Sequence, residues 1–309
     1  IAYRFGLVVV EHQMGPGHIG QVGGDVTAGD GNLAVLHVLG VDEGDLVDEV
    51  ELIEQHGAVR RLCLNRPQAR NAQSQQMLDV LDAAFEDAKN DNDTRVVVLA
   101  ASGPHFSAGH DLKQAEAERA DFSVEQRWAY EEKRYFGYCM RIWDFPKPTV
   151  VQVQGACVAA GFMLANMCDL MVASEDAFFS DPVSHTMGAA ATEVLIHPWV
   201  LGLRQAKELL FTGERLGAHE AKTLGMVNRV VPREDLDSAT LALAQRIAQG
   251  PPFAMQLLKR SLNRSIDVRG MREALSAHFD LHQLSHVSEE YRATKEAGLA
   301  GAIAKGKLA

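Results

Sequence analysis

The sequence has few cysteines, and their spacing excludes two classes of small protein. The four thiols, Cys63, Cys139, Cys157 and Cys168, are far apart in 309 residues, and no C-x-x-C pair occurs. Such spacing supports neither a zinc knuckle nor a dense disulfide framework. We therefore expect a protein of a reducing compartment, the cytoplasm.

Positive charge and long apolar runs are also scarce. The chain has 30 Lys and Arg against 41 Asp and Glu, a net charge of −11 with neutral His. This balance disfavours nucleic acid or an anionic membrane as a partner. The longest apolar stretch, Ala156 to Ala165, is about half the ~20 residues that a membrane span requires. The apolar run that ends at Val10 is too short for the core of a signal peptide, so we expect a soluble protein.

The first 47 residues differ in composition from the rest. Residues 1–46 contain ten of the 26 glycines, six acidic residues and one basic residue. We expect an appendage over residues 1–47, with short strands at 7–10 and 33–39 between glycine turns. Gly15 to Gly20 matches G-x-G-x-x-G, but the glycines that follow would break the helix that a dinucleotide site needs. No NAD site is predicted.

From about residue 48 the pattern becomes regular α/β. Apolar runs that predict strands alternate with segments of helical spacing, and after about residue 189 nearly every segment is helical. The expected strands are 50–53, 59–64, 95–100, 149–153 and 170–173, and the expected helices are 77–88, 123–143, 159–167, 191–200, 203–212, 217–224, 233–249, 252–265, 270–287 and 289–304. We divide this part into a core, 48–232, and a helical region, 233–309.

Two glycine-containing turns follow two buried strands. The first is Phe106 to Leu112, and the second, Gln154 to Gly161, opens a helix. The carboxyl ends of parallel strands are where α/β proteins bind ligands, and a helix N-terminus presents unpaired N–H groups to negative charge. The two turns therefore predict an oxyanion hole, a pair of amides that stabilises negative charge on a substrate oxygen.

These turns belong to an ordered series of motifs. The series consists of Asn65-Arg66-Pro67-x-x-Arg70-Asn71-Ala72, Phe106-Ser107-Ala108-Gly109-x-Asp111-Leu112, Lys147-Pro148-Thr149-Val150, Gly155, Ala159-Ala160-Gly161, Cys168-Asp169-Leu170 and Phe211-Thr212-Gly213-Glu214-Arg215. In this order and spacing the series resembles the crotonase superfamily, the enoyl-CoA hydratases and isomerases. The resemblance covers about residues 48–307, nearly everything except the appendage.

The resemblance implies a ββα spiral core, a C-terminal helical trimerisation region and an acyl-CoA or enoyl-CoA thioester as the ligand. It implies a homotrimer or a dimer of trimers, with no metal and no cofactor apart from the coenzyme A of the substrate. By their positions in the motifs, the backbone N–H groups of His110 and Ala160 would form the oxyanion hole. This arrangement suits an enolate, because removal of a proton next to a thioester places charge on the carbonyl oxygen.

The resemblance also implies a set of substrate contacts. The turn that begins at Arg70 would lie near the adenine and phosphates of coenzyme A, and a lysine near the C-terminus would reach a phosphate. The expected substrate-binding residues are Arg70, Ala72, Ala108, Asp111, Leu112, Met163, Val183 and Lys305.

Two residues of the superfamily's hydratase chemistry are missing. Hydratases use one glutamate to activate water and another to transfer a proton, and the motifs place these at Met163 and at or beside Val183. A thioether and an alkyl group cannot exchange a proton. The label enoyl-CoA hydratase would commonly be applied, but hydration by the usual pair is not expected.

Other titratable groups between residues 181 and 197 are candidates for acid/base chemistry. His185 and Glu193 are eight residues apart and could form a carboxylate-oriented imidazole, which is the arrangement of a general base. Asp181 and His197 are further candidates. Each has a structural alternative: Asp181 could start a turn, Glu193 could stabilise the first turn of a helix, and His197 could end one.

Three functions follow from these residues. The first is an acyl-CoA enzyme that stabilises a thioester enolate with the amides of His110 and Ala160; the His110 imidazole would then either take part in proton transfer or face solvent or pantetheine. The second is an acyl-CoA-binding subunit that kept the amides and lost the acid/base groups. The third is a superfamily hydrolase or isomerase that uses His185, Glu193 or Asp181.

Overall fold

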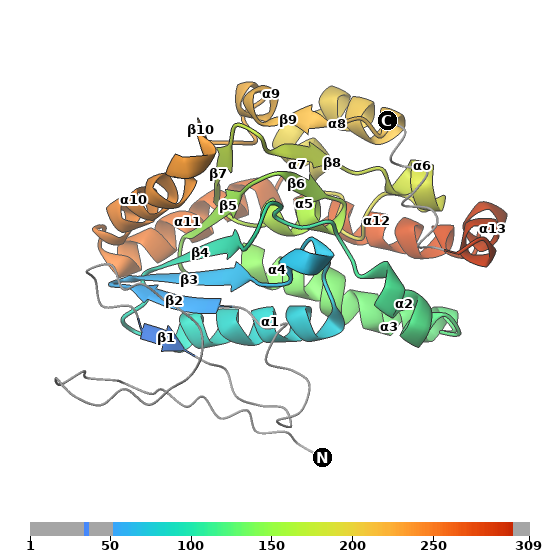
Figure 1. Cartoon of the computed structure of the whole chain (residues 1–309), viewed down its shortest axis with the longest axis horizontal. Coiled ribbons are helices and arrows are strands. Elements are labelled where there is room, and N and C mark those ends of the chain that lie inside the picture. Colours follow the sequence, from blue (N-terminus) through green and yellow to red (C-terminus); the bar gives the residue numbers. More distant parts are fainter. Residues whose placement is uncertain (1–33, 37–51, 299–309) are drawn as a thin grey trace, which may run out of the picture.

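A seven-stranded sheet forms the middle of the molecule. The computed structural model describes residues 34–36 and 52–298, and the strand order in this sheet is β1-β2-β3-β4-β5-β7-β10 (Figure 1). β1 to β3 pair antiparallel, whereas the pairs from β3 to β10 are parallel. The strands are β1 (Ala34–Leu36), β2 (Leu52–His56), β3 (Val59–Leu64), β4 (Val96–Ala101), β5 (Thr149–Val153), β7 (Leu170–Ser174) and β10 (Arg229–Val231).

A second sheet of three short strands has the order β6-β8-β9. Its strands are β6 (Ala156–Val158), β8 (Phe178–Ser180) and β9 (Leu216–Gly217). Two residues separate β6 from the end of β5, and β6 leads into helix α5, so the second glycine-containing turn runs from one sheet into the other. An isolated bridge between Ser107 and Cys157 joins the first turn to β6.

Helices cover both faces of the larger sheet. They are α1 (Gln75–Asn90), α2 (Leu112–Arg119), α3 (Val124–Glu131), α4 (Tyr138–Trp143), α5 (Ala160–Ala165), α6 (Val183–Met187), α7 (His197–Leu201), α8 (Leu203–Thr212), α9 (Ala218–Thr223), α10 (Leu236–Ala248), α11 (Pro252–Asp267), α12 (Met271–Ser285) and α13 (Glu289–Glu296). α10 lies at one end of the molecule, and α12 and α13 lie at the other, beside α2 and α3 (Figure 1).

The parallel strands separate two hydrophobic cores. Val98 and Val150 pack with Ala244 of α10 in the smaller core. Leu99 and Phe162 belong to the larger core, which includes residues of α1, α4 and α5. Because the pleat turns neighbouring side chains to opposite faces, β4 is buried along its whole length, which explains its unbroken apolar sequence.

The α/β prediction is confirmed, and most predicted elements lie within a few residues of the observed ones. The predicted helix over 123–143 begins with the expected capping box between Ser123 and Gln126. It is interrupted by a π-turn at Glu132–Gly137. A β-carbon on Gly137 would lie 2.9 Å from the carbonyl oxygen of Glu132, so glycine permits the wider turn.

The predicted helix over 191–200 is wrong for its first six residues. Residues 188–196 are irregular, Ala191 has a φ of 59°, and the helix begins only at His197. The sequence pattern missed α2 and α6, which are short and carry little apolar periodicity.

Several predictions lie wholly or partly outside the described residues. These are the appendage with its strand at 7–10 and G-x-G-x-x-G segment, most of the strand at 33–39, and Lys305. Within the described ranges, none of the helices has the length and apolar character that crossing a bilayer would require.

Candidate active site

The two predicted turns are in contact. Gly109 has a φ of 95°, and a β-carbon there would lie 3.1 Å from the carbonyl oxygen of Val158 and 3.3 Å from the backbone nitrogen of Ala160. A β-carbon on Gly161 would lie 2.7 Å from the carbonyl oxygen of Ser107. Glycine at both positions therefore allows the backbones of the two turns to pack directly together.

The geometry leaves the backbone N–H groups of His110 and Ala160 as available donors. Gln73 and His110 form a parallel bridge in which Gln73 N–H donates to Gly109 O at 2.8 Å and Asp111 N–H donates to Gln73 O at 3.1 Å. His110 N–H consequently points away from Gln73. Ala160 is the first residue of α5 and has no acceptor within its own helix. Within residues 52–298, neither N–H donates a hydrogen bond to a backbone carbonyl.

Gln73 is a site residue that the sequence analysis missed. It bridges the first turn through its backbone, and its Nε2 donates to the carbonyl oxygen of Ala160 at 3.1 Å. One buried residue therefore contacts both turns, the first through its backbone and the second through its side chain. Its place directly after the Arg70-Asn71-Ala72 motif was the available signal.

An apolar pocket adjoins the turns. It is lined by residues of α1, α4, α5 and the π-turn: Gln73, Leu78, Leu81, Asp82, Phe85, Arg134, Tyr135, Tyr138, Cys139, Arg141, Ile142, Met163 and Leu164. As it stands the pocket has a volume of about 20 Å³, room for one water-sized group, and it opens to solvent at its mouth. Met163 lies three residues after Ala160, so the pocket begins one helical turn from the second amide.

The turn at Arg70 is held firmly by its neighbours. Asn71 Nδ2 donates to the carbonyl oxygens of Ser102 and His105, each at 2.9 Å, and Ala108 N–H donates to Arg70 O at 3.0 Å. The Arg70 side chain is exposed, as a contact to a phosphate would require. Asp111 instead has a structural role.

Asp111 caps α2, and Leu112 begins that helix. Asp111 Oδ1 accepts from Gln114 N–H at 3.1 Å, and its Oδ2 lies 3.0 Å from Nη1 of Arg66. Asp111, Leu112 and Ala72 are all half-buried. Ala108, in the first turn, is exposed.

The predicted His185–Glu193 pair is wrong. His185 is exposed at the C-terminal end of α8, where its Nε2 lies 2.6 Å from the carbonyl oxygen of Phe211. α6 ends at Gly188 in a left-handed conformation, and the irregular segment after it carries Glu193 into the core. The two side chains therefore leave the chain in different directions.

Glu193 pairs with His110 instead. Its Oε2 lies 3.1 Å from Nε2 of His110, and the Glu193 side chain is 5% exposed. The His110 ring stacks on Tyr135 from the π-turn, with 3.7 Å between the ring centroids. Burial alone would raise the pKa of Glu193, but His110 and His282 outweigh it and hold this pKa well below its usual value. Glu193 is therefore a carboxylate that orients the imidazole.

Asp181 and His197 form a second buried pair. Asp181 Oδ2 lies 3.2 Å from Nε2 of His197, and both side chains are 0% exposed. The His197 ring stacks on Phe162 at 4.4 Å between centroids. Asp181 Oδ1 also accepts from Val183 N–H at 3.2 Å, which agrees with the turn predicted as its structural alternative. His197 begins α7 and does not end a helix.

Both positions assigned to the missing glutamates carry buried apolar side chains. Met163 is 2% exposed and lines the apolar pocket. Val183 packs with Ala189 and Tyr291, and Ala159 contacts this cluster from beside the second amide. Asp82 also lines the pocket, and Asp181 reaches the backbone N–H of Val183, but neither carboxylate occupies the position of a missing glutamate.

Known proteins resemble this chain over most of its length. The family model described as Enoyl-CoA hydratase/isomerase matches residues 54–302. A Mycobacterium tuberculosis protein named "Putative enoyl-CoA hydratase EchA13" is 44% identical over 247 residues, 74% of this chain and 78% of that protein. A Xenopus laevis protein named Enoyl-CoA hydratase domain-containing protein 3, mitochondrial, is 32% identical over 263 residues, 83% of this chain and 84% of that protein.

Solved structures agree. The crystal structure of an enoyl-CoA hydratase/isomerase from Xanthobacter autotrophicus Py2 superposes with a TM-score of 0.77 at 35% identity, covering 84% of this chain and 97% of that one. The predicted fold class, an α/β core of this type followed by a helical region, is therefore confirmed.

Proposed function

Because the chain belongs to the enoyl-CoA hydratase/isomerase family, we propose that it acts on an acyl-CoA or enoyl-CoA thioester whose carbonyl oxygen accepts hydrogen bonds from the N–H groups of His110 and Ala160. The observation that carries this proposal is the contact between the two turns, where the β-carbon position of Gly109 lies 3.3 Å from Ala160 N. Two amide donors at adjoining turns are suited to an enolate oxygen.

The proton transfer is assigned to the His110 imidazole. Nε2 of His110 faces the carboxylate of Glu193 and therefore has the hydrogen of the neutral ring, which leaves the lone pair on Nδ1. Nδ1 is buried and has no hydrogen-bond partner among the described residues. The C–H bond next to the thioester breaks, its proton moves to Nδ1, and the electron pair becomes the enolate. If a proton returns to the same carbon, the result is hydrogen exchange with solvent. If it goes to the γ carbon of an enoyl chain, the double bond shifts.

The acyl group is assigned to the apolar pocket. Met163 and Tyr135 line it, and Tyr135 also stacks on His110, so the pocket adjoins both the amide and the imidazole. An apolar lining suits a hydrocarbon chain, and the flexible side chain of Met163 would move aside to admit one. Coenzyme A would extend toward the exposed side chain of Arg70.

Isotope exchange tests the proposal. The full chain is incubated in D₂O with butyryl-CoA, and deuterium incorporation next to the thioester is followed by NMR. Ala160→Pro removes one N–H at the first position of a helix, which proline tolerates, and the loss of such a donor reduces the rate by about 10²–10³-fold. Exchange at the wild-type rate in a folded Ala160→Pro variant would refute the oxyanion hole.

The acyl-CoA-binding subunit remains the second candidate, because Met163 and Val183 place apolar groups where the hydratases have glutamates. Tight binding of butyryl-CoA without any exchange would favour it. The hydrolase alternative based on His185 is withdrawn, and Asp181 is fully buried against His197.

We further propose a trimeric assembly in the cytoplasm. Phe253, Leu258 and Leu262 of α11 are 52–71% exposed in the single chain, an apolar surface suited to a subunit contact. Four buried cysteines without a disulfide agree with a reducing compartment. Sedimentation velocity of the full chain tests the first proposal, and fractionation of the source cells tests the second.

A further inference from the structure

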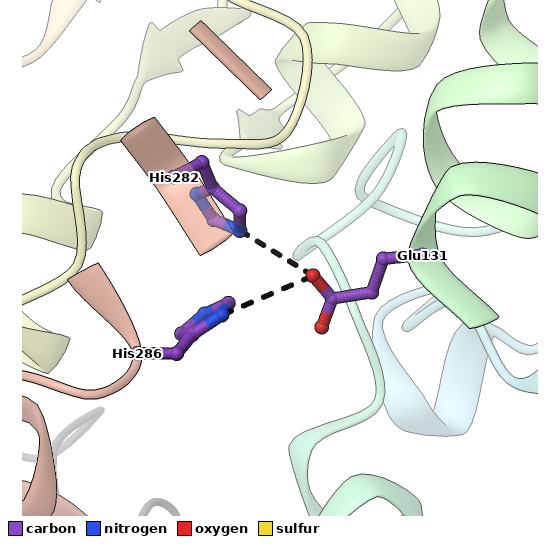
Figure 2. Close-up of side chains that lie close together, drawn as sticks. All are labelled: Glu131, His282 and His286. Atoms are coloured by element: carbon purple, nitrogen blue, oxygen red, sulfur yellow. Dashed lines mark ion pairs between the residues drawn. The ribbon is translucent and has the colours of Figure 1, made fainter. Parts of the chain in front are cut away.

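Three potential metal ligands gather behind the candidate active site, a feature that the proposed function does not use. Glu131 is the last residue of α3, and His282 and His286 lie four positions apart at the end of α12, so both rings lie on one side of that helix. Figure 2 shows the two rings facing the carboxylate. One oxygen or nitrogen atom from each residue lies within 4.8 Å of the other two.

The ring nitrogens that face Glu131 are not satisfied by hydrogen bonds. Nε2 of His282 lies 3.6 Å from Oε2 of Glu131, and Nδ1 of His286 lies 4.0 Å from the same oxygen. Both nitrogens are buried, and neither has a hydrogen-bond partner in the described part of the chain. Around one tetrahedral Zn²⁺, two ligand atoms are about 3.4 Å apart, so a small contraction of the cluster would suffice.

The surroundings of His282 set its tautomer. Nδ1 of His282 lies 3.0 Å from the carbonyl oxygen of Ala191. A carbonyl only accepts hydrogen bonds, so Nδ1 has a hydrogen and Nε2 faces the cluster. Burial lowers the pKa of His282, but the carboxylates of Glu131 and Glu193 outweigh it and raise this pKa to about 10, so a metal ion at Nε2 would take the place of a proton. A backbone carbonyl that orients a metal-binding histidine in this way is a common outer contact of metal sites.

The Glu131 carboxylate is oriented by its own neighbours. Arg127 Nη1 donates to Oε1 at 3.3 Å, and Gln283 Nε2 donates to Oε2 at 2.6 Å. Oε2 keeps a second lone pair for the two histidines. Glu193 Oε1 also lies 3.6 Å from Nε2 of His282.

We propose that Glu131, His282 and His286 bind a divalent transition-metal ion, with Zn²⁺ as the best fit. Two imidazoles and a carboxylate suit zinc, whereas Ca²⁺ and Mg²⁺ prefer sites made of oxygen ligands. Three protein ligands leave one position open for water. The ion would connect α3 to α12, which are distant in sequence. A bound ion would contradict the expectation, made from the sequence, that the chain has no metal.

Zinc binding by the untagged full chain tests the proposal. After treatment with a chelator and removal of the chelator, the protein is titrated with ZnCl₂ by calorimetry, and bound metal is counted by mass spectrometry. We expect one Zn²⁺ per chain. At free Zn²⁺ about 100 times the dissociation constant, the ratio of folded to unfolded protein rises about 100-fold, which thermal unfolding detects as a higher melting temperature.

Two variants and a matched control locate the ion. Glu131→Gln and His286→Ala each remove one ligand and are expected to abolish the stoichiometric binding and the rise in melting temperature. His278→Ala is the control, because His278 lies one turn earlier in α12 and contacts the carbonyl oxygen of Thr192 at 2.8 Å, outside the cluster. Its binding is expected to stay at one ion per chain.

Three results would overturn the proposal: no stoichiometric binding by the wild type, binding that survives in both variants, or binding that is lost only in His278→Ala. His286 is only partly buried, so His286→Ala is the variant expected to fold if Glu131→Gln does not. Co²⁺ in place of Zn²⁺ gives an independent readout, since its visible absorption reports the coordination number and the nitrogen ligands.

Discussion

Nε2 of His110 lies 3.1 Å from Oε2 of Glu193, although the two residues are 83 positions apart in the chain. The same residue contributes an N–H to the first turn and an imidazole that stacks on Tyr135. Substitution of its side chain leaves the backbone N–H in place. The main-chain and side-chain contributions of His110 can therefore be measured separately.

His110→Ala is expected to lower the rate of proton exchange by about 10²-fold or more, because a positioned acid/base group contributes about 10²–10⁴-fold. Glu193→Gln keeps the shape but removes the carboxylate and is expected to lower the same rate. His185→Ala serves as the control, because that residue contacts Phe211 and not Glu193. If His110→Ala retains the wild-type rate, the imidazole has no part in proton transfer.

Gly161→Ala is expected to disturb the contact between the turns. The added methyl group would lie 2.7 Å from Ser107 O and 2.9 Å from Ser107 Cβ. Overpacking of this kind costs about 1–3 kcal/mol in the free energy of unfolding, and it would move the neighbouring N–H of Ala160. The free energy of unfolding, measured with denaturant, and the exchange rate should both decrease.

Gly217→Ala is the matched control for this substitution. Gly217 has a φ of −74°, and a methyl group there meets no described atom within 4 Å. Its stability and activity should remain close to the wild type. Equal losses in Gly161→Ala and Gly217→Ala would show that the contact between the turns is not the cause.

Asp181→Ala removes the carboxylate that lies beside His197 and accepts from the Val183 N–H. It is expected to lower the free energy of unfolding by about 1–3 kcal/mol, the cost of a buried donor left without its acceptor. Both side chains of this pair are 0% exposed. Asp176→Ala breaks an ion pair with Arg233 whose side chains are 53% and 38% exposed, and the expected loss is below about 1 kcal/mol. Urea unfolding of the two variants would reveal the difference; similar losses would contradict a special role of burial.

Asp91 is expected to make stability dependent on pH in the acid range. Burial raises its pKa, but hydrogen bonds from Thr94 and the Asp93 N–H and the charge of Arg60 outweigh it, so the pKa is lower in the folded than in the unfolded protein. The stabilisation is therefore present above the unfolded value, about 3.9, and is lost as the pH falls through the lower folded value.

Asp91→Asn should flatten this part of the profile of stability against pH. Unfolding measured between about pH 2.5 and 6 tests it, with Asp93→Asn, which is exposed at the same turn, as the control. An unchanged profile in Asp91→Asn would contradict the assignment.

Local sequence determined most of the secondary structure and one part of the site. The unbroken apolar run of β4 and the capping box at Ser123 are local patterns, so their consequences were visible in the sequence. Gly109 and Gly161 contact distant parts of the chain, Val158 and Ser107, and were predicted from the motifs that contain them. The π-turn that ends at Gly137 was not visible in the sequence, because the spacing of apolar residues in a helix does not show where one extra residue is inserted.

The pairing of charged side chains was decided only by the tertiary structure. Glu193 lies eight residues after His185, and that spacing suggested a pair, but the irregular segment 188–196 directs Glu193 to His110 and to α12. The physical reason is that a buried carboxylate must find compensating partners wherever the packed elements supply them. Motif order therefore determined the family and predicted the two amides, while the packing of distant helices decided which histidine each carboxylate contacts.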